Sequence, residues 1–566
     1  MADHLDLSLV EKDLTRKALE RIGPMGWLRQ SYDVPDAFWK GLLGANGAFF
    51  TLPAKSRLHG KYDFHHDIFA RNQQNPAPAF RWFQETGGWQ ELSYSRLERL
   101  VVREAARWVS LGAATGQILC IVSHLNERFL ISLLAALKTG LIVSILPPLG
   151  FSFLRRRIDA LAPDFIWAPD ENTPLLAQYR GILLTEGAAG RTEPGDSRSH
   201  SYTGSRPFAL CFDPSTATPD VPRELNADSA YLCAVRDGSV ALGLRPGQAM
   251  AAPGFGIMET QPALLLACLL SGATYVHIEE RDVARNPGLL LDRPLRAVGV
   301  TPAIREILLG SPVEVGKTWD FWFRDPAESR DIEAWTEFVE ALKLRDAFSC
   351  NQRWNASLGG CILFSVRRKG SPHAHMLPAA GVPWSLADLA DSERDSLSGS
   401  GWFAVRPPGM EKGGIVAGGM LAEGKNEWLF VRPVLSGRSG KFYPAAKVLE
   451  AVSGLPYGSS CSVVEAPVSR ADGFSLFVLL VFVGGRRVNE ALISENIRKK
   501  IVRELGKEFL PDAVQIVPLH PRRGEDGSID HEWCTKKYLS GGLSRRARGE
   551  VYRCLAELRD LIHDYR

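Results

Sequence analysis

Apolar segments of strand length alternate with helical segments in this 566-residue chain. ILCIV is followed by the helical FLISLLAALKTG, which ends at Gly140, and then by the apolar LIVSILPP. The alternation returns between residues 227 and 310, in ALLLACLLSG, ATYVHI and LRAVGV. Strands that are apolar throughout are buried on both faces, as in parallel sheets covered by helices. The sequence therefore predicts an α/β protein with layered, mostly parallel sheets.

The chain divides into a large segment and a smaller C-terminal one. A glycine-rich zone at 409–440 precedes a compact pattern: AAKVLEAVSG as a helix, SCSVVEAPV and FSLFVLLVFV as strands, SENIRKKIVRELGKE as a helix and AVQIVPL as a strand. This change places a domain boundary near residue 438. The prediction has four parts: an N-terminal extension packed on the body (1–67), a large domain (68–437), a small α+β domain (438–545) and a tail helix (546–566).

Charge and cysteine usage exclude several classes of protein. The 67 Lys and Arg residues nearly balance the 64 Asp and Glu residues, so we expect neither nucleic acid nor an anionic membrane as a partner. The most apolar stretches fall short of the roughly 20 residues that a membrane-spanning helix needs. The nine cysteines contain no CxxC pair, which argues against a zinc ribbon. We expect a cytoplasmic protein with reduced thiols and no bound metal.

Five further segments carry a framework pattern: ELSYSRLERLVVREAARWVSLGAATGQILCIV, LLAALKTGLIVSILPP, LLLACLLSGATYV, GKFYPAAKVLEAV and FLPDAVQIVPLHPRRGEDGSID. In this order they resemble the adenylate-forming superfamily of acyl-CoA synthetases, fatty acyl-AMP ligases and nonribosomal adenylation domains. The resemblance covers residues 68–545. It implies a large N-terminal domain, a small mobile C-terminal domain and a site in the cleft between them.

The family joins a carboxylate to the α-phosphate of ATP, and the resemblance implies four groups for that reaction. They are a Ser/Thr/Gly loop for the phosphates, an acid for Mg²⁺, an acid for the ribose and a lysine. We matched the loop, T-S-G-S-T-G-x-P-K-G in the family, to Arg236, Asp237, Gly238 and Ser239, after a predicted strand AYLC. Asp237 would repel a triphosphate there. The alternative, which the Asp-Gly dipeptide favours, is a tight hairpin turn between two strands.

The magnesium acid of the family's Y-G-x-T-E motif falls on Leu358, with Trp354, Asn355 and Ser357 at the aromatic, glycine and threonine positions. Leucine offers no metal ligand, so no metal site is predicted. Trp354 is either a pocket residue that stacks on a ligand or a buried core aromatic, and the core role is the more common one. Phe255 falls near the family's aromatic gate and is a candidate pocket residue.

The ribose acid and the lysine are missing as well. Gly419 stands where the ribose-binding aspartate belongs, and Ser528 stands at the lysine position in GEDGSID. Serine carries no charge and has a shorter reach, so the main stabiliser of the transition state is lost. Lys536, His373 and His375 are kept as substitute catalytic candidates, and the alternative for the histidines is an ordinary surface or loop position. Otherwise the catalytic residues are unknown.

A retained framework with lost phosphate chemistry predicts a degenerate ligase homologue that does not use ATP and Mg²⁺. We expect ATP-independent acyl transfer or condensation in specialised metabolism, driven by proximity and orientation. The candidate cofactors and partners are CoA and the phosphopantetheine of an acyl carrier protein. Two alternatives stay open: a non-catalytic scaffold for carrier proteins or a true ligase, and a divergent but active ATP-dependent acyl-AMP or acyl-CoA ligase.

Overall fold

The chain forms two compact units, Met1–Pro433 and Val434–Arg566. The division therefore lies a few residues before the boundary near 438 that the sequence predicts. No helix in the described part of the chain is long and apolar enough to cross a membrane. This computed structural model describes residues 26–45, 60–184, 198–213, 221–311, 315, 318–324, 332–365, 367–370, 376–387, 393–394, 399–409, 415–425, 428–433, 445–467, 475–486, 488–523, 529, 533–534, 537–538 and 543.

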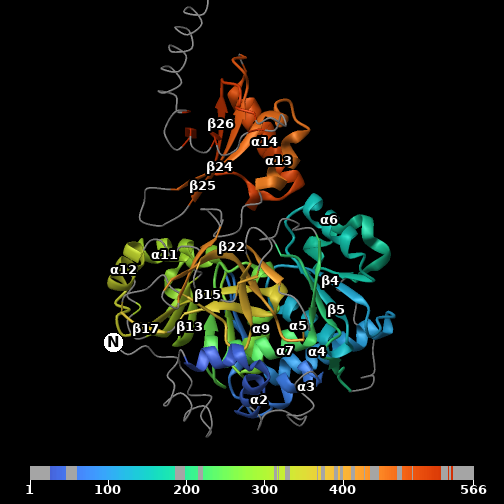
Figure 1. Ribbon diagram of the computed structural model, residues 1–566. Coiled ribbons are helices and arrows are strands. Elements are labelled where there is room, and N and C mark those ends of the chain that lie inside the picture. Colours follow the sequence, from blue (N-terminus) through green and yellow to red (C-terminus); the bar gives the residue numbers. More distant parts are fainter. Residues whose placement is uncertain are drawn as a thin grey trace, which may run out of the picture. The chain divides into compact units, whose positions relative to one another are not determined.

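The larger unit is built on a ten-stranded sheet with a parallel centre (Figure 1). The strand order is β18-β16-β15-β14-β13-β11-β12-β2-β3, with β17 paired to β15. Neighbours are parallel from β15 to β2, and the antiparallel strands lie outside that run. The prediction of a mostly parallel sheet is confirmed. The strands are β2 (Pro78–Gln84), β3 (Gly88–Ser93), β11 (Ala249–Ala251), β12 (Thr274–His277), β13 (Leu295–Gly299), β14 (Trp319–Arg324), β15 (Phe348–Asn355), β16 (Gly360–Phe364), β17 (Arg368–Lys369) and β18 (Leu377–Pro378).

A second sheet of six strands has the order β10-β9-β5-β4-β6-β7, with only β10 antiparallel to its neighbour. Helix α5 (Glu127–Thr139) connects two of its strands and begins where the Asn126 side chain accepts from the Phe129 amide. It ends at Gly140, whose φ of 84° suits a residue without a Cβ. The strands are β4 (Ile118–Val122), β5 (Ile142–Leu146), β6 (Phe165–Trp167), β7 (Leu183–Leu184), β9 (Pro207–Cys211) and β10 (Arg223–Asn226).

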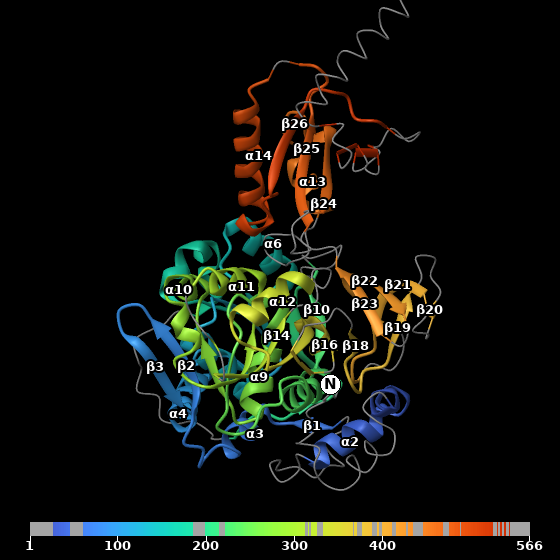
Figure 2. The same ribbon diagram turned by 90° about the vertical axis from the view of Figure 1, so that its left-hand side faces the viewer.

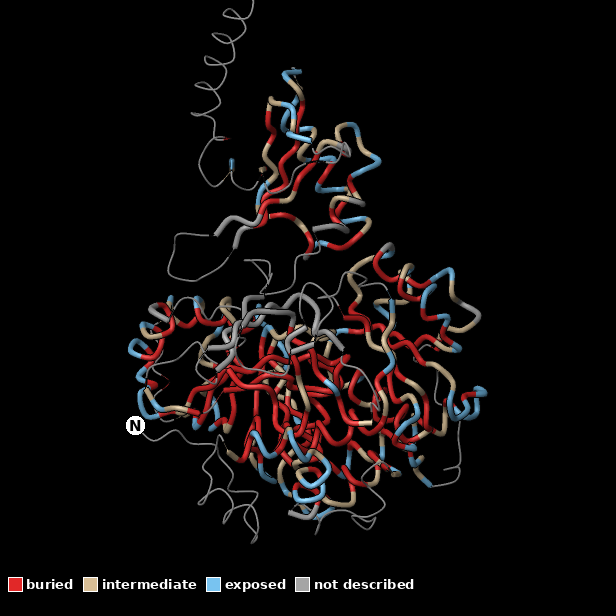
Figure 3. The backbone as a smooth tube through the Cα atoms, in the orientation of Figure 1, coloured by how far each residue is buried: buried red, intermediate tan, exposed pale blue. Residues whose placement is uncertain are grey.

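Buried helices join the two sheets. Helices α4 (Tyr94–Ser110) and α9 (Ala263–Leu270) pack on the ten-stranded sheet, and α5 and α7 (Ala227–Arg236) pack on the six-stranded one. The two sets contact each other through the pairs α4–α5 and α7–α9. All eight residues of α9 are buried, which confirms the predicted buried helix before the strand ATYVHI. Figure 3 shows the buried residues concentrated in the interior of the larger unit.

The described part of the N-terminal segment shares the main core. Trp27, Trp39 and Leu43 are buried in the same cluster as the sheet residues, and the Tyr32 hydroxyl donates to the Pro378 carbonyl at 2.5 Å. The segment includes α2 (Pro35–Ala45), and α3 (Phe64–Ala70) runs across the predicted boundary at 67. Residues 26–45 are therefore part of the larger unit's body.

The rest of the larger unit consists of peripheral helices and two smaller sheets. The glycine-rich zone contains two strands of a five-stranded sheet, ordered β20-β19-β21-β22-β23 (Figure 2). The elements are β1 (Lys61–Tyr62), α6 (Phe151–Leu161), β8 (Tyr202–Thr203), α8 (Ile257–Thr260), α10 (Glu280–Arg285), α11 (Pro302–Leu309), α12 (Ile332–Ala341), β19 (Trp384–Ala387), β20 (Glu393–Arg394), β21 (Gly399–Val405), β22 (Ile415–Lys425) and β23 (Trp428–Pro433).

In its described residues the smaller unit has a three-stranded sheet and the α-helices α13 and α14. Its strand order is β24-β25-β26, with β24 antiparallel and β26 parallel to β25. Each of the five predicted elements of this segment is present. The predicted tail helix at 546–566 lies outside the described residues. The elements are α13 (Ala445–Ser453), β24 (Cys461–Pro467), β25 (Ser475–Phe482), α14 (Glu490–Glu504) and β26 (Ala513–Val517).

Candidate functional site

The carboxyl ends of strands from both large sheets come together in the larger unit. β9 leads into Asp213 and β15 ends at Asn355, and these two side chains are hydrogen bonded. The short helix α8, which follows the carboxyl end of β11, packs against both β5 and β15. In open α/β sheets, ligands bind at the carboxyl ends of the parallel strands. The carboxyl ends of these strands, which we call this edge of the sheets, are therefore the candidate functional site.

Asp213 is the centre of a nearly buried polar network at this edge. Asn355 Nδ2 donates to Asp213 Oδ2 at 2.9 Å, and Ser357 Oγ lies 3.4 Å from the same oxygen. Ser357 also donates to Asn355 Oδ1 at 2.7 Å. Arg223 Nη1 lies 3.7 Å from Asp213 Oδ2, and the two side chains are 31% and 4% exposed. The carboxylate is thus held inside, while its arginine partner is reachable from solvent.

The turn after β11 adds an aromatic side chain to the edge. Phe255 is half-buried, and its ring centroid lies 5.4 Å from that of Phe323 near the carboxyl end of β14. A Cβ on Gly299, at the carboxyl end of β13, would come within 2.7 Å of the Phe255 ring. Phe255 therefore covers the ends of two neighbouring strands. Its role as a pocket residue stays a prediction, and its position is compatible with that role.

Two titratable residues at strand ends are held in their uncharged forms. Burial, with a smaller contribution from His124, lowers the pKa of His277 at the end of β12 to about 4. Burial, and then Asp213, raises the pKa of Cys211 at the end of β9 to about 12. At neutral pH these residues are a neutral imidazole and a protonated thiol. Neither carries a charge that would attract or repel a ligand.

The segment that the sequence analysis interpreted as a strand and a hairpin turn is helical. Helix α7 begins where the Asn226 side chain accepts from the Ser229 amide, and it continues into a π-helical turn at Asp237–Ala241. The strand predicted for AYLC and the hairpin predicted at Asp237 and Gly238 are therefore wrong. Every residue of α7 is buried, so its sequence has no polar face that would reveal a helical period.

Arg236 and Asp237 form an ion pair inside the core, with side chains that are 1% and 0% exposed. Arg236 approaches Asp237 Oδ1 at 2.7 Å, the Cys361 amide donates to Asp237 Oδ2 at 2.7 Å, and Arg236 donates to the carbonyls of Cys361 and Ala380. Burial raises the pKa of Asp237 to about 6, although Arg236 and the Cys361 amide favour its ionised form. The pair joins α7 to β16, which is a structural role.

Gly238 and Ser239 are also in the core. A Cβ on Gly238 would come within 2.1 Å of Ser271 Oγ and 2.4 Å of the Ala267 carbonyl oxygen, so the π-helical turn packs directly on α9. Ser239 Oγ donates to the Val235 carbonyl at 2.7 Å. The residues that were matched to the phosphate loop are thus buried, and their polar atoms are used by protein partners. This corrects the predicted position of the loop.

Two solved structures share this architecture. The amide bond synthetase McbA from Marinactinospora thermotolerans aligns with 84% of this chain over 100% of its own length, at 14% identity and a TM-score of 0.67. A lysine-to-alanine variant of that enzyme aligns with 84% of this chain over 99% of its own length, at 14% identity and a TM-score of 0.64. The chain has the adenylate-forming ligase fold. No protein-family profile and no curated protein matches it.

The connection between β9 and β10 is rich in hydroxyl side chains. The family pattern follows a strand, and the sequence after β9 contains the hydroxyl residues Ser215, Thr216 and Thr218. Arg223 follows Pro222 in the order of the family's Pro-Lys pair. Residues 214–220 lie outside the described residues. This Ser/Thr-rich segment after FALC was not among the segments that were compared with the phosphate loop from the sequence.

The segment that was matched from the sequence to the family's acid lies beside the Asp213 network. Leu358 is 2% exposed, belongs to the main core and ends a short 3₁₀ turn, Ala356–Leu358. Trp354 is 3% exposed, and its Nε1 donates to Gln352 Oε1 at 3.1 Å, so the prediction of a buried core aromatic is confirmed. From this segment, Asn355 and Ser357 contact Asp213, whereas Trp354 and Leu358 pack inward.

The remaining predicted site residues are not joined to this network by the structure. Gly419 lies in β22 of the five-stranded sheet, and its assignment to the ribose position stays a prediction. Ser528, Lys536, His373 and His375 lie outside the described residues. Asp213 and Arg223, which the structure brings together, were not predicted, because residues that meet only through the fold leave no local pattern in the sequence.

Proposed function

We propose that this chain transfers acyl groups from thioesters of CoA or of an acyl carrier protein to an acceptor, without ATP. The bond between the acyl carbon and sulfur breaks, and a bond forms from that carbon to a nitrogen or oxygen of the acceptor. The proton of the acceptor passes to the departing thiolate. A thioester is already activated, so the reaction needs no adenylate. Holding the two reactants in line supplies the catalysis.

The Asp213 network is the observation that carries the proposal. Arg223 already balances Asp213 at 3.7 Å, so a magnesium ion would meet a resident cation. Leu358 offers no oxygen. We infer from the Asp213–Arg223 pair and from Leu358 that this end of the sheets does not hold magnesium.

The cysteines support direct transfer between donor and acceptor. All eight described cysteines are buried or half-buried free thiols. Burial raises the pKa of Cys233 to about 12, as it does that of Cys211. A thiol that stays protonated at neutral pH is a poor nucleophile. We therefore expect no acyl-enzyme intermediate on these residues.

The test uses purified full-length protein and no ATP. Acyl-CoAs and acylated carrier protein, over a range of chain lengths and aryl groups, are combined with amine and alcohol acceptors. Released thiol is followed with a colorimetric disulfide reagent, and products are identified by mass spectrometry. We expect thiol release above the protein-free rate, with no change when ATP and Mg²⁺ are added. Absence of product over the whole panel would overturn the proposal.

An active ligase is the alternative that one observation favours. Asp213 Oδ2 lies 3.4 Å from Ser357 Oγ, so a carboxylate is present near the position where the family acid is lost. ATP–pyrophosphate exchange over a panel of carboxylic acids separates the two functions. Exchange that disappears in Asp213→Asn would establish the ligase, whereas thiol release without exchange supports acyl transfer.

A further inference from the structure

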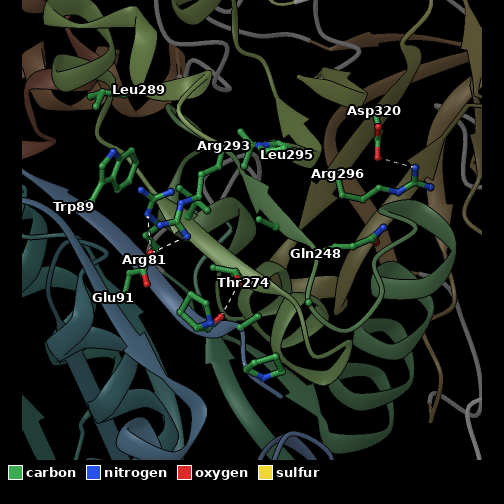
Figure 4. A pocket seen from close by; sticks show the side chains of 17 residues that line it. Arg81, Trp89, Glu91, Gln248, Thr274, Leu289, Arg293, Leu295, Arg296 and Asp320 are labelled. Carbon is green, nitrogen blue, oxygen red and sulfur yellow. Dashed lines mark hydrogen bonds and ion pairs between the residues drawn. The ribbon is translucent and has the colours of Figure 1, made fainter. Parts of the chain in front are cut away.

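A cavity of about 630 Å³ opens at the amino ends of the parallel strands in the ten-stranded sheet (Figure 4). Its lining includes the first residues of β11, β12 and β13, which are Ala249, Thr274 and Leu295. The Asp213 network lies at the carboxyl ends of strands, whereas the cavity lies at the amino ends. Nothing in the proposed acyl transfer uses it. Any ligand here is separate from the substrates of that reaction.

The size and the apolar wall of the cavity suit a small organic molecule. Ligand sites in proteins measure roughly 300–1,000 Å³ and are mainly apolar with a few polar groups. Here Val276, Leu289 and Leu295 are buried residues of the wall, and the indole of Trp89 forms one side. A ligand with an apolar part of about one aromatic ring can therefore bury that part against this wall and displace water from it.

One end of the cavity is electrostatically closed. The Arg81 guanidinium lies 3.9 Å from the centre of the Trp89 ring, and Arg81 pairs with Asp292 at 2.8 Å. Arg81 and Arg293 share Glu91, at 3.3 and 3.0 Å. Figure 4 shows Arg81, Trp89, Glu91 and Arg293 gathered together. Two arginines are thus matched by two acids, and this end has no unmatched charge to offer a ligand.

The other end has a fixed cation with a replaceable partner. The Arg296 side chain is 19% exposed, and its Nε donates to the Gly243 carbonyl at 3.2 Å. Its acid partner, Asp320, is 60% exposed and lies 3.5 Å away. Arginine is already desolvated here, whereas the aspartate is mostly in water. A ligand carboxylate can therefore take the place of Asp320 at small additional cost, and guanidinium geometry suits a carboxylate.

We propose that this cavity binds a small monocarboxylate with a planar apolar body. The carboxylate pairs with Arg296, and the body lies over Leu295 and Val276 toward Trp89. A phosphate dianion is a poorer fit, because Glu91 and Asp320 also line the cavity and would repel a second negative charge.

The test is a titration of the full chain with para-fluorobenzoate, followed by fluorine NMR line width. The variants Asp320→Asn and Arg296→Gln are expected to shift the affinity in opposite directions. Removing the competing acid tightens binding by up to about fivefold, the value of an exposed ion pair. Removing the cation weakens it by about tenfold or more, the value of a charged hydrogen bond. Arg285→Gln, an exposed arginine outside the cavity, is the matched control and should change little, whereas Arg293→Gln tests the other end of the cavity.

Three ligands and three variants decide the outcome. The uncharged para-fluorobenzyl alcohol and para-fluorophenyl phosphate should both bind more weakly than the carboxylate. The proposal is overturned by the absence of saturable binding, by stronger binding of the phosphate, or by a larger loss in Arg293→Gln than in Arg296→Gln. If Arg296→Gln does not fold, Asp320→Asn decides alone, because the Asp320 side chain is exposed and its replacement should not disturb folding. Unchanged or weaker ligand binding in Asp320→Asn would then contradict the proposal.

Discussion

Two ion pairs in the larger unit have the same chemistry and different surroundings. Arg236 and Asp237 approach to 2.7 Å with side chains 1% and 0% exposed, and each is bonded to the backbone of other elements. Arg223 and Asp213 are 3.7 Å apart near the carboxyl ends of the strands, and the arginine is 31% exposed. The first pair is part of the packing. The second can exchange partners, which a binding site requires and a core does not permit.

The largest test of this comparison is Asp237→Asn. Arg236 would then be a buried cation without its carboxylate, and we expect a loss of about 3–5 kcal/mol in the free energy of unfolding. Urea denaturation measures it. The control is the double variant Arg236→Met with Asp237→Leu, which should lose less because both charges are removed. A single variant within about 1 kcal/mol of the parent protein would show that the pair is not structural.

The response of the core to pH sharpens the contrast. Burial, and then Lys138 and His66, lowers the pKa of His65 to about 3. The folded state keeps this imidazole neutral, whereas the unfolded chain protonates it below pH ~6.5. Its contribution to stability is therefore complete above pH 6.5 and is lost as the pH falls toward 3. Between about pH 6.5 and 4 we expect a loss of ~3 kcal/mol.

The variant His65→Leu isolates this effect. Urea denaturation of both proteins at several pH values should show a smaller acid-induced loss in the variant, since leucine binds no proton. Parallel curves for the two proteins would mean that other groups carry the acid sensitivity.

A smaller change in stability is expected for Asp213→Asn. The asparagine keeps one oxygen for Asn355 and Ser357, but it replaces the charge and the second acceptor oxygen with an amide NH₂, so the free energy of unfolding should fall by about 1–2 kcal/mol. The acyl-transfer rate should change more, by about tenfold or more in kcat/KM. Thiol release and urea denaturation of one preparation measure both. A large loss of stability with unchanged transfer would place Asp213 with the structural pairs.

The smallest effect is expected at an exposed pair. Arg285 and Glu85 are 2.8 Å apart, and their side chains are 60% and 72% exposed. Arg285→Gln should change the free energy of unfolding by less than about 0.5 kcal/mol, because water screens the pair. A loss of stability as large as that of Asp237→Asn would show that the contribution of an ion pair to stability does not depend on its burial, which contradicts the comparison.

Much of the fold follows from apolar patterns in the sequence, and much of the site does not. ILCIV became β4 and FSLFVLLVFV became β25, because strands buried on both faces are apolar at every position. AYLC was predicted as a strand and is part of the helix α7. Since α7 is buried on all sides, this segment of it is apolar throughout, as that of a buried strand would be. Long-range contacts such as that between Asp213 and Asn355 leave no local signal.

The place of β2 in the ten-stranded sheet has a consequence for synthesis on the ribosome. β2 pairs with its neighbour β3 on one side and, in parallel, with β12 on the other, and Phe80 lies opposite Tyr275. The hairpin of β2 and β3 therefore leaves the ribosome long before β12 does. Until β12 is made, the hydrogen-bonding groups on one side of β2 have no partner strand. Such edges bind other chains, and parallel pairing at long sequence separation is slow. We expect the nascent N-terminal part to need chaperone cover until β12 has been made.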